Sequence, residues 1–407
     1  MINQLYDRIY SWSNGENHVY TDFKQIIKEL PRLRDESRTL REILLTNLVM
    51  IGEIPAPTFG EGRRLEFLQH RFAECHLQNC STDPAGNVLG IYPGRDGKRS
   101  ILLVAHADTV FPETADHTVS LQADHAAGIG LADNSLGLAV LATLPTLFEK
   151  ADIELESNLI LMGATTSLGH GNLAGLRFFL DNNRVPLTAG VCVEGVELGR
   201  LSMASIGMLR GEITCSISEE YDWSRFGTTS AILTLNEVIN RIMEIPLPKR
   251  PRTNVVLGTI EGGQSFNTIA KKAVLGFEIR SESADMVNEI ARHMHNITAE
   301  IASASGSEIK LDIFARRQPG GINFSHPLAE RSRQIMEALN IPLRVAPSTS
   351  ELSAFIDQKL PALTTAITTA ENLNEPGEKI YIDPMFTGMA QLVGMILAID
   401  GGFCDEN

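Results

Sequence analysis

The first two hundred residues alternate between short apolar runs and longer segments with apolar residues at helical spacing. The short runs have the length of buried strands and occur at 87–91, 100–105, 158–162 and 190–193. The periodic segments predict helices at 37–54, 61–75, 135–149 and 173–182. Strands that alternate with helices indicate an α/β domain built on a largely parallel sheet.

A different pattern follows Ser202. Strands are expected at 206–217, 272–280 and 309–315, and helices at 228–243 and 284–303. Together they form an α+β unit of roughly a hundred residues, a usual domain size. Beyond Gly320 the α/β pattern resumes, with a helix at 326–339, a strand at 361–367 and a helix at 384–399. The smaller unit is therefore predicted to be inserted into the larger one.

We predict two domains, which the length of 407 residues also favours. The larger comprises 1–203 and 317–407 and is an α/β domain with a mixed sheet flanked by helices. The smaller comprises 204–316 and has a four-stranded sheet with two helices on one face. Residues 1–38 are polar and charged, and we interpret them as an N-terminal extension with helical character near 22–30.

The net charge and the composition argue against some classes of binding partner. The net charge of −15 argues against nucleic acid and anionic membranes, because both reward basic patches. The apolar runs are short, so no membrane span is expected, and the polar N-terminus has no apolar leader. Five scattered cysteines without a CxxC pair are typical of reduced cysteines in a cytoplasmic protein.

Candidate metal chemistry begins at an apolar strand that ends in His106-Ala-Asp108. Function in open α/β sheets gathers at the carboxyl ends of strands, so His106 is a candidate metal ligand and Asp108 a candidate for orienting its ring. Asp133 precedes an apolar helix, where it is either a ligand or a helix cap. Glu194 ends another apolar strand, and the three residues His106, Asp133 and Glu194 make a nitrogen and oxygen set suited to zinc.

Further motifs follow the same order along the chain. They are Ala56-Pro-Thr, Gly86-Asn-Val, Ala132-Asp133-Asn134-Ser, Glu194-Gly195, Gly262-Gly-Gln-Ser-Phe-Asn267-Thr-Ile, Arg280 in Glu-Ile-Arg-Ser, and Ser348-Thr-Ser before Leu360-Pro-Ala. With the His-x-Asp strand, they resemble the zinc-dependent exopeptidases and deacylases, which include peptidase T, glutamate carboxypeptidase, acetylornithine deacetylase and aminoacylase. The resemblance runs from about Leu40 to Gly394 and implies a catalytic domain with an inserted lid domain.

The resemblance also implies roles for individual residues. Family members hold two zinc ions that share a bridging aspartate, which Asp133 matches here. His106 and Glu194 match the remaining ligands of the first zinc, and Asp108 matches the acid that orients the histidine. The lid domain pairs two chains in many members, so the resemblance implies a homodimer.

The catalytic pattern is broken at four positions. The family's pair of glutamates supplies the general base and a second-zinc ligand, but Ser167 and Leu168 occupy those positions here. No Asp or Glu occurs between Glu156 and Asp181, so a shifted alignment does not restore the pair. Asn374 stands at the position of a second-zinc histidine, and Tyr221 at that of a lid histidine. General-base assistance is worth about 10²–10⁴ in rate, so the loss of function should be large.

Two readings of the function remain open. In the first, the chain is a catalytically impaired homologue that binds a peptide-like or acyl-amino-acid ligand. Arg280, Asn267 and Tyr221 are the candidate ligand contacts, and at most one divalent metal, zinc first, is expected. In the second, the chain is an active one-metal hydrolase of peptide or N-acyl amino acid bonds with a repositioned base. His170, close to the missing pair, is the candidate for that base.

Overall fold

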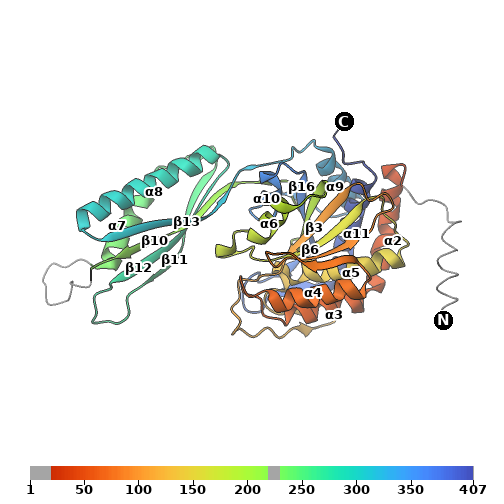
Figure 1. Ribbon diagram of the computed structural model, residues 1–407, viewed down its shortest axis with the longest axis horizontal. Coiled ribbons are helices and arrows are strands. Elements are labelled where there is room, and N and C mark those ends of the chain that lie inside the picture. Colours follow the sequence, from red (N-terminus) through yellow and green to blue (C-terminus); the bar gives the residue numbers. More distant parts are fainter. Residues whose placement is uncertain (1–19, 219–229, 407) are drawn as a thin grey trace.

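The computed structural model describes residues 20–218 and 230–406 (Figure 1). Its larger body is built on a mixed eight-stranded sheet. The strand order is β1 (Gln78–Thr82), β2 (Val88–Tyr92), β6 (Asn158–Ala164), β3 (Ser100–His106), β7 (Leu187–Val196), β16 (Ala362–Thr368), β8 (Arg200–Ser202) and β15 (Arg344–Val345). The four central strands run parallel, whereas β1, β2 and β8 pair antiparallel with their neighbours β2, β6 and β16.

Helices cover both faces of this sheet, which explains why its central strands are largely buried. Every residue of β3 and of β16 is buried. One face packs under a helical layer made of α2 (Phe23–Thr39), α3 (Arg41–Gly52), α4 (Gly62–Glu74), α5 (Leu136–Lys150), α9 (Pro327–Ala338) and α11 (Ile382–Asp400). The other face packs under α6 (Ala174–Asn182) and α10 (Leu352–Asp357).

Helix α2 changes the interpretation of the N-terminal residues. Asp22 caps the helix by accepting a hydrogen bond from the backbone N–H of Lys24. Ile26, Leu30 and Leu33 are fully buried, and the helix packs along α11. Residues 20–38 are therefore part of the body's core, not an extension, because they present one apolar stripe on a charged helix. The rest of the predicted extension lies outside the described residues.

The lid is a separate antiparallel sheet with the order β11 (Thr253–Gly262), β12 (Lys272–Ser281), β10 (Gly207–Ser216) and β13 (Glu308–Arg317). Helices α7 (Ala231–Met243) and α8 (Ala284–Ser305) pack on it, and the side chains of Ser230 and Ser283 cap their first turns. The predicted four-stranded sheet with two helices is confirmed. Strand β11 was missing from the predicted elements.

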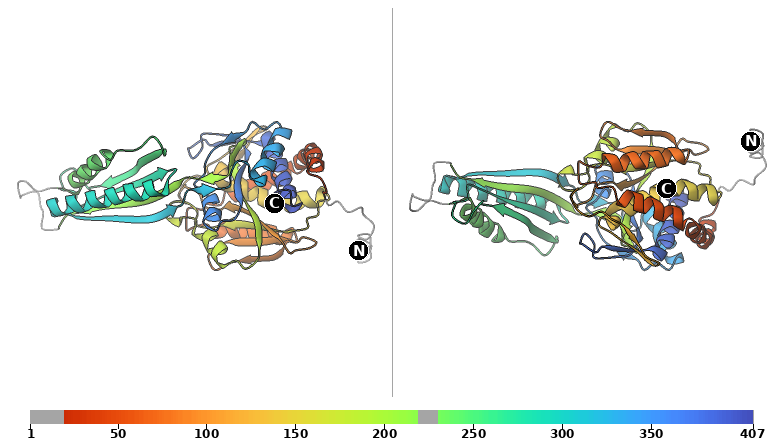
Figure 2. Two further views of the ribbon diagram at one scale, coloured as in Figure 1. Left: turned by 90° about the horizontal axis from the view of Figure 1, so that it is seen from above. Right: turned by 90° about the horizontal axis from the view of Figure 1, so that it is seen from below.

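The lid joins the body through two short antiparallel strands, β9 (Ala204–Ser205) and β14 (Gly320–Gly321). Because the lid projects from one end of the body, the molecule is elongated (Figure 2). The entry strand lies against the loop that precedes α10, since the carbonyl oxygen of Ala204 accepts a hydrogen bond from the N–H of Ser348 at 2.9 Å. Residues of this loop thus lie at the base of the lid.

A second small sheet was not predicted. It has the order β17 (Ala370–Glu371), β18 (Lys379–Tyr381), β5 (His125–Ala127) and β4 (Ser120–Leu121). Its pairing brings the 370–381 hairpin beside the chain that leads into Asp133.

Within the described part of the chain, two helical segments are long and apolar enough to cross a membrane, Leu131–Lys150 and Ile382–Asp400. In both, more than four fifths of the most apolar window is buried inside the body. Packing in the core accounts for their composition.

Candidate metal centre and ligand cavity

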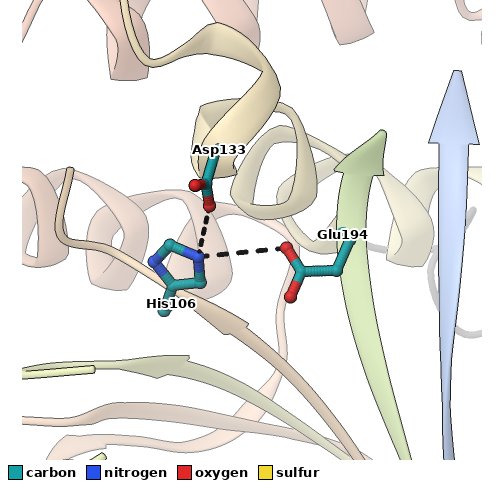
Figure 3. A group of neighbouring side chains, drawn as sticks. All are labelled: His106, Asp133 and Glu194. Carbon is teal, nitrogen blue, oxygen red and sulfur yellow. Dashed lines mark hydrogen bonds and ion pairs between the residues drawn. The ribbon is translucent and has the colours of Figure 1, made fainter. Parts of the chain in front are cut away.

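His106 lies at the carboxyl end of β3, with its ring fixed on both sides. Nδ1 is 2.9 Å from the backbone carbonyl oxygen of Asp108. A carbonyl only accepts hydrogen bonds, so Nδ1 carries a proton and Nε2 faces the other way. Nε2 is 2.8 Å from Oδ1 of Asp133 and 3.9 Å from Oε2 of Glu194 (Figure 3).

These three side chains need a cation between them. One ligand atom from each lies within 4.8 Å of the others, and the set is one nitrogen and two carboxylates. If the ring were neutral, the Nε2 lone pair would point at two carboxylates and the group would repel itself. A divalent ion or a proton removes that repulsion, so the residues fit a metal that prefers nitrogen and oxygen ligands.

The pKa values follow the same electrostatics. Burial lowers the pKa of His106, but the charge of Glu351 and contacts with two aspartates raise it, leaving it well above its usual value. Burial raises the pKa of Glu194 to about 8, against the opposing effect of His106. Without a metal, this site therefore holds protons at neutral pH.

Asp133 lies in the irregular turn Leu131–Ser135 that precedes α5, and it does not cap that helix. The next residue, Asn134, fixes the turn instead. Its Nδ2 donates to the carbonyl of Val193 at 2.7 Å, and its Oδ1 accepts from the N–H groups of Gly137 and Gly195. Asn134 is 1% exposed. It therefore joins the turn that carries Asp133 to the strand that carries Glu194.

Glu378 supports the turn from its other side. This fully buried carboxylate accepts a hydrogen bond from the N–H of Ala132 at 2.8 Å and one from the N–H of Asn374 at 3.0 Å. Burial raises its pKa, and the backbone hydrogen bonds oppose that rise. Glu378 was missed in the sequence because only the small sheet of β5 and β18 brings it to this place.

Asp108 contacts the histidine ring mainly through its backbone. Its carboxylate Oδ1 is 3.4 Å from Nδ1 of His106, farther than the carbonyl oxygen. The carboxylate accepts hydrogen bonds from the N–H groups of Ser167 and Leu168, at 3.2 and 2.7 Å, and from the hydroxyl of Thr58. Burial alone would raise the pKa of Asp108, but these contacts and His106 lower it.

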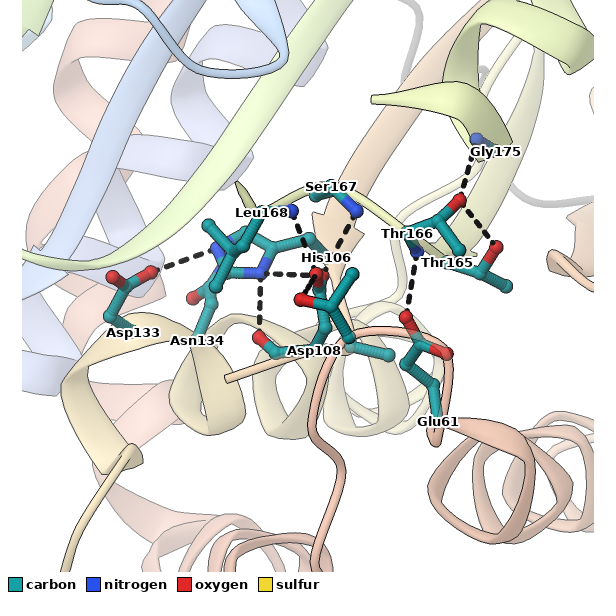
Figure 4. A network of polar contacts seen from close by, with 12 residues as sticks. Glu61, His106, Asp108, Asp133, Asn134, Thr165, Thr166, Ser167, Leu168 and Gly175 are labelled. Atoms are coloured by element: carbon teal, nitrogen blue, oxygen red, sulfur yellow. Dashed lines mark hydrogen bonds and ion pairs between the residues drawn. The ribbon is translucent and has the colours of Figure 1, made fainter. Parts of the chain in front are cut away.

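The segment that lacks the glutamate pair is thus firmly held. Glu61 accepts a hydrogen bond from the N–H of Thr166 at 2.8 Å, next to the two bonds to Asp108 (Figure 4). Buried Arg64 donates to the carbonyls of Ile54 and Ala107 beneath the same corner. The buried Ser167 hydroxyl has no hydrogen-bond partner among the residues that the structure describes. A serine and a leucine, not two acids, therefore line this part of the site.

The position that the family resemblance assigns to a second metal gains no replacement ligand in the described parts of the chain. Asn374 is exposed, and its backbone N–H is bound to Glu378. Among residues 20–218 and 230–406, one cluster of three or more His, Cys, Asp or Glu side chains has the spacing of a metal site, and it is the His106 group.

His170 does not reach the metal cluster. Its ring stacks on Phe314 of lid strand β13, with centroids 3.9 Å apart, and Nε2 lies 3.4 Å from a carboxylate oxygen of Glu212 on β10. Asn172 adds a hydrogen bond to the carbonyl of Phe314 at 3.3 Å. The structure places His170 as a contact between body and lid, so it offers no support for a role as the base.

A cavity of about 280 Å³ opens beside the metal cluster. The arginines that line it are Arg200, Arg210 and Arg317, of which the last two lie on lid strands. Burial lowers the pKa of Arg317 to about 10, with Glu351 opposing, so the guanidinium stays charged at neutral pH. Arg210 is already paired with Glu278 at 2.5 Å. Among the described residues, Arg317 has no ion-pair partner, and its buried Nε has no hydrogen-bond partner.

Glu351 is a second residue that the sequence reading missed. It is 2% exposed, lines the cavity, and its Oε1 has no hydrogen-bond partner among the described residues. Its charge acts on His106, Glu194 and Arg317. The Ser348-Thr-Ser motif just before it was the available signal, but only the fold shows that the loop faces the cavity.

The three candidate ligand contacts of the lid lie elsewhere. Arg280 is outside the cavity lining, half exposed on β12, and paired with Glu278. Asn267 lies in the exposed turn after β11, where its side chain accepts a hydrogen bond from Ser265. Tyr221 is outside the described residues. Within one chain, Arg210 and Arg317 take the place at the cavity that was expected for Arg280.

The lid and several solved structures connect this architecture to known proteins. Residues 226–305 match the peptidase dimerisation domain of the M20 family. A tripeptidase from Staphylococcus aureus is similar in structure, with 16% identity, a TM-score of 0.70, and coverage of 88% of this chain and 98% of its own. The dipeptidase Dug1p from Saccharomyces cerevisiae has 11% identity and a TM-score of 0.75 over 91% and 98% of the two chains.

A third similar structure is that of a metal-binding protein. A dinuclear metal binding peptidase of the M20 family from Bacillus subtilis shares 14% identity and a TM-score of 0.61, covering 89% of this chain and 99% of its own. No curated protein sequence matches this chain. At these identities the structures establish the fold and not the reaction. The resemblance read from the motifs is thereby confirmed, and the chain has the two-domain fold of the M20 metallopeptidases, with their peptidase dimerisation domain.

Proposed function

We propose that this protein is a catalytically impaired M20 homologue that binds a peptide-like or acyl-amino-acid ligand in the cavity beside His106. The observation that carries the proposal is the state of the base position. Ser167 and Leu168 occupy it, and both are fixed through their backbone N–H groups to the carboxylate of Asp108. A serine hydroxyl is a poor proton acceptor at neutral pH, so the loss costs about 10²–10⁴ in rate.

Ligand binding has its own support. A buried guanidinium with an unpartnered Nε lines the cavity at Arg317. Arginine binds carboxylates through two parallel hydrogen bonds, and a carboxylate ligand would compensate the buried charge. Peptides and N-acyl amino acids carry such a carboxylate. Arg280, Asn267 and Tyr221 remain proposed contacts only through the family resemblance.

The proposed metal content is one divalent ion per chain at most, held by His106, Asp133 and Glu194. When bound, such an ion would act as a Lewis acid that polarises a ligand's carbonyl oxygen. Around it, this chain's residues orient the ring of His106 through Asp108 and hold the turn of Asp133 through Asn134.

One observation favours a second function, an active one-metal hydrolase of peptide or N-acyl bonds. Glu351 is a buried carboxylate on the cavity wall with a free oxygen, the chemical type that the base position lacks. It is a better candidate for a repositioned base than His170, which contacts the lid. In this alternative, turnover would be present and Glu351→Gln would remove it.

Two further proposals concern the whole molecule. The peptidase dimerisation domain supports a homodimer formed through the lid. Light scattering that gives a monomer at micromolar concentration would contradict the proposed homodimer.

The five unpaired cysteines support a cytoplasmic location.

Binding can be tested by thermal denaturation with dipeptides, tripeptides and N-acyl amino acids, in the presence of Zn²⁺, Co²⁺ or Mn²⁺. A ligand at a hundred times its Kd should stabilise the native state by about 2.7 kcal/mol. We expect Arg317→Met to remove this effect. Arg316→Met is the matched control, because Arg316 is exposed on the same strand. If no compound stabilises the wild type, the binding proposal is wrong.

A further inference from the structure

The corner of the site where a second metal would sit is lined by leucines. Leu168 occupies the position of a second-metal ligand, and Leu373 is the neighbour of Asn374, the other such position. Both leucines line the cavity, together with Leu173, which is 1% exposed. A divalent ion requires oxygen or nitrogen ligands, so these residues do not fit a second metal.

The leucines are also well placed to stay where they are. The N–H of Leu168 is bound to the Asp108 carboxylate at 2.7 Å, and the N–H of Asn374, next to Leu373, is bound to Glu378 at 3.0 Å. Leu373 is nevertheless 44% exposed, and Leu168 is partly exposed. Apolar surface that lies open in a cavity costs free energy unless a ligand covers it.

The same cavity contains the buried guanidinium of Arg317. The cavity therefore combines a buried cationic anchor, the guanidinium of Arg317, with an aliphatic wall. A ligand that satisfies both has a carboxylate and, attached near it, an aliphatic group.

We propose that the lost second-metal position has become an apolar subsite, in which Leu168 and Leu373 bind the aliphatic part of a carboxylate ligand such as an N-acyl amino acid. The inference rests on the proposed binding function and adds the chemical class of the ligand. Each methylene that the subsite covers should tighten binding about fourfold, from roughly 0.8 kcal/mol per buried CH₂.

Isothermal titration calorimetry with N-acetyl-, N-butyryl- and N-hexanoylglycine tests the subsite. We expect Kd to fall by about an order of magnitude for each two methylenes, until the subsite is full. Leu373→Ser should flatten this dependence while N-acetylglycine still binds. Leu373 is exposed, so this substitution should leave the fold intact. Leu168→Ser is an independent second variant. Leu343→Ser, at an exposed leucine outside the cavity lining, is the control and should leave the series unchanged.

The possible outcomes distinguish failure of the apolar subsite from failure of carboxylate binding. Equal affinities across the series, or a series that Leu373→Ser and Leu168→Ser both leave unchanged, would overturn the apolar subsite but leave carboxylate binding intact. Failure of every acylglycine to bind would overturn both proposals. The double variant Leu168→Glu with Asn374→His gives two readouts, one with the ligand series and one from metal content alone. We expect this double variant to lose the chain-length dependence and to bind more zinc per chain than the wild type, as measured by metal analysis.

Discussion

Asn134 lies 2.7 Å from Val193, with its Nδ2 donating to the backbone carbonyl one residue before Glu194. The same side chain accepts hydrogen bonds from the N–H groups of Gly137 and Gly195. One buried amide thus sets the spacing between the turn of Asp133 and the end of β7. The geometry of the proposed metal site depends on this residue although it contributes no ligand atom.

Asn134→Ala should therefore lower the free energy of unfolding by about 3 kcal/mol, because buried backbone groups lose their partners. Urea denaturation monitored by circular dichroism measures the change. Asn323→Ala is the control, since Asn323 is exposed and the variant should stay within about 0.5 kcal/mol of the wild type. A change at Asn134 no larger than the control's would show that the turn does not need this side chain.

Metal affinity should rise with pH. The metal-free site holds protons because the pKa of Glu194 is raised to about 8 and that of His106 is also raised. A metal must displace these protons, so zinc or cobalt binding should tighten from pH 6 to pH 8 and release protons. Calorimetry in two buffers of different ionisation enthalpy counts them. Affinity that does not depend on pH would mean that the site is not protonated as described.

The same shifts determine how the metal-free protein responds to pH. A pKa raised in the folded state contributes stability that is fully present below the unfolded pKa and is lost as pH rises through the folded value. The contribution of Glu194 should therefore disappear between pH 4.5 and about 8. Thermal denaturation of metal-free wild type should show this loss, and His106→Ala, which removes the partner, should alter it. A contribution that grows across this window would contradict the assignment.

The contact of His170 with the lid leads to another prediction. His170→Ala removes the ring that stacks on Phe314 and the 3.4 Å contact with Glu212. Hydrogen–deuterium exchange should become faster at 169–173, where body and lid meet, because local opening costs less free energy. His293→Ala on the exposed side of α8 should have no such effect. Unchanged exchange in the first variant would show that the contact does not hold the lid.

The pattern of apolar residues was enough to predict the strands that are buried on both faces of the sheet. β3 and β16 are buried at every position and rich in apolar residues, so their positions could be predicted within one or two residues. β11 was missed because it is an edge strand with many exposed positions and a glycine within it. α2 was misread because its polar residues outnumber the single buried stripe through Ile26 and Leu30.

The site residues also fall into those that the sequence predicted and those that it did not. His106, Asp133 and Glu194 each follow or end a recognisable element, so their types and positions pointed to a metal, and the fold brings them together. Glu351, Arg317 and Glu378 reach the site through the lid junction and a small sheet that no local pattern reveals. Arg280 had the right residue type and the right domain, but its side chain pairs with Glu278. The division of the chain at residues 204 and 316 remains a prediction about folding units.

If the base position no longer supports hydrolysis, as we propose, the wild type and a metal-site variant should not differ in turnover. Product release from dipeptides, tripeptides and N-acyl amino acids should be followed at saturating Zn²⁺, Co²⁺ and Mn²⁺ for the wild type and for His106→Ala. We expect the two proteins to give the same rate, equal to that of the reaction without protein. Turnover by the wild type that His106→Ala abolishes would contradict it, and loss of that turnover in Glu351→Gln would then identify the repositioned base.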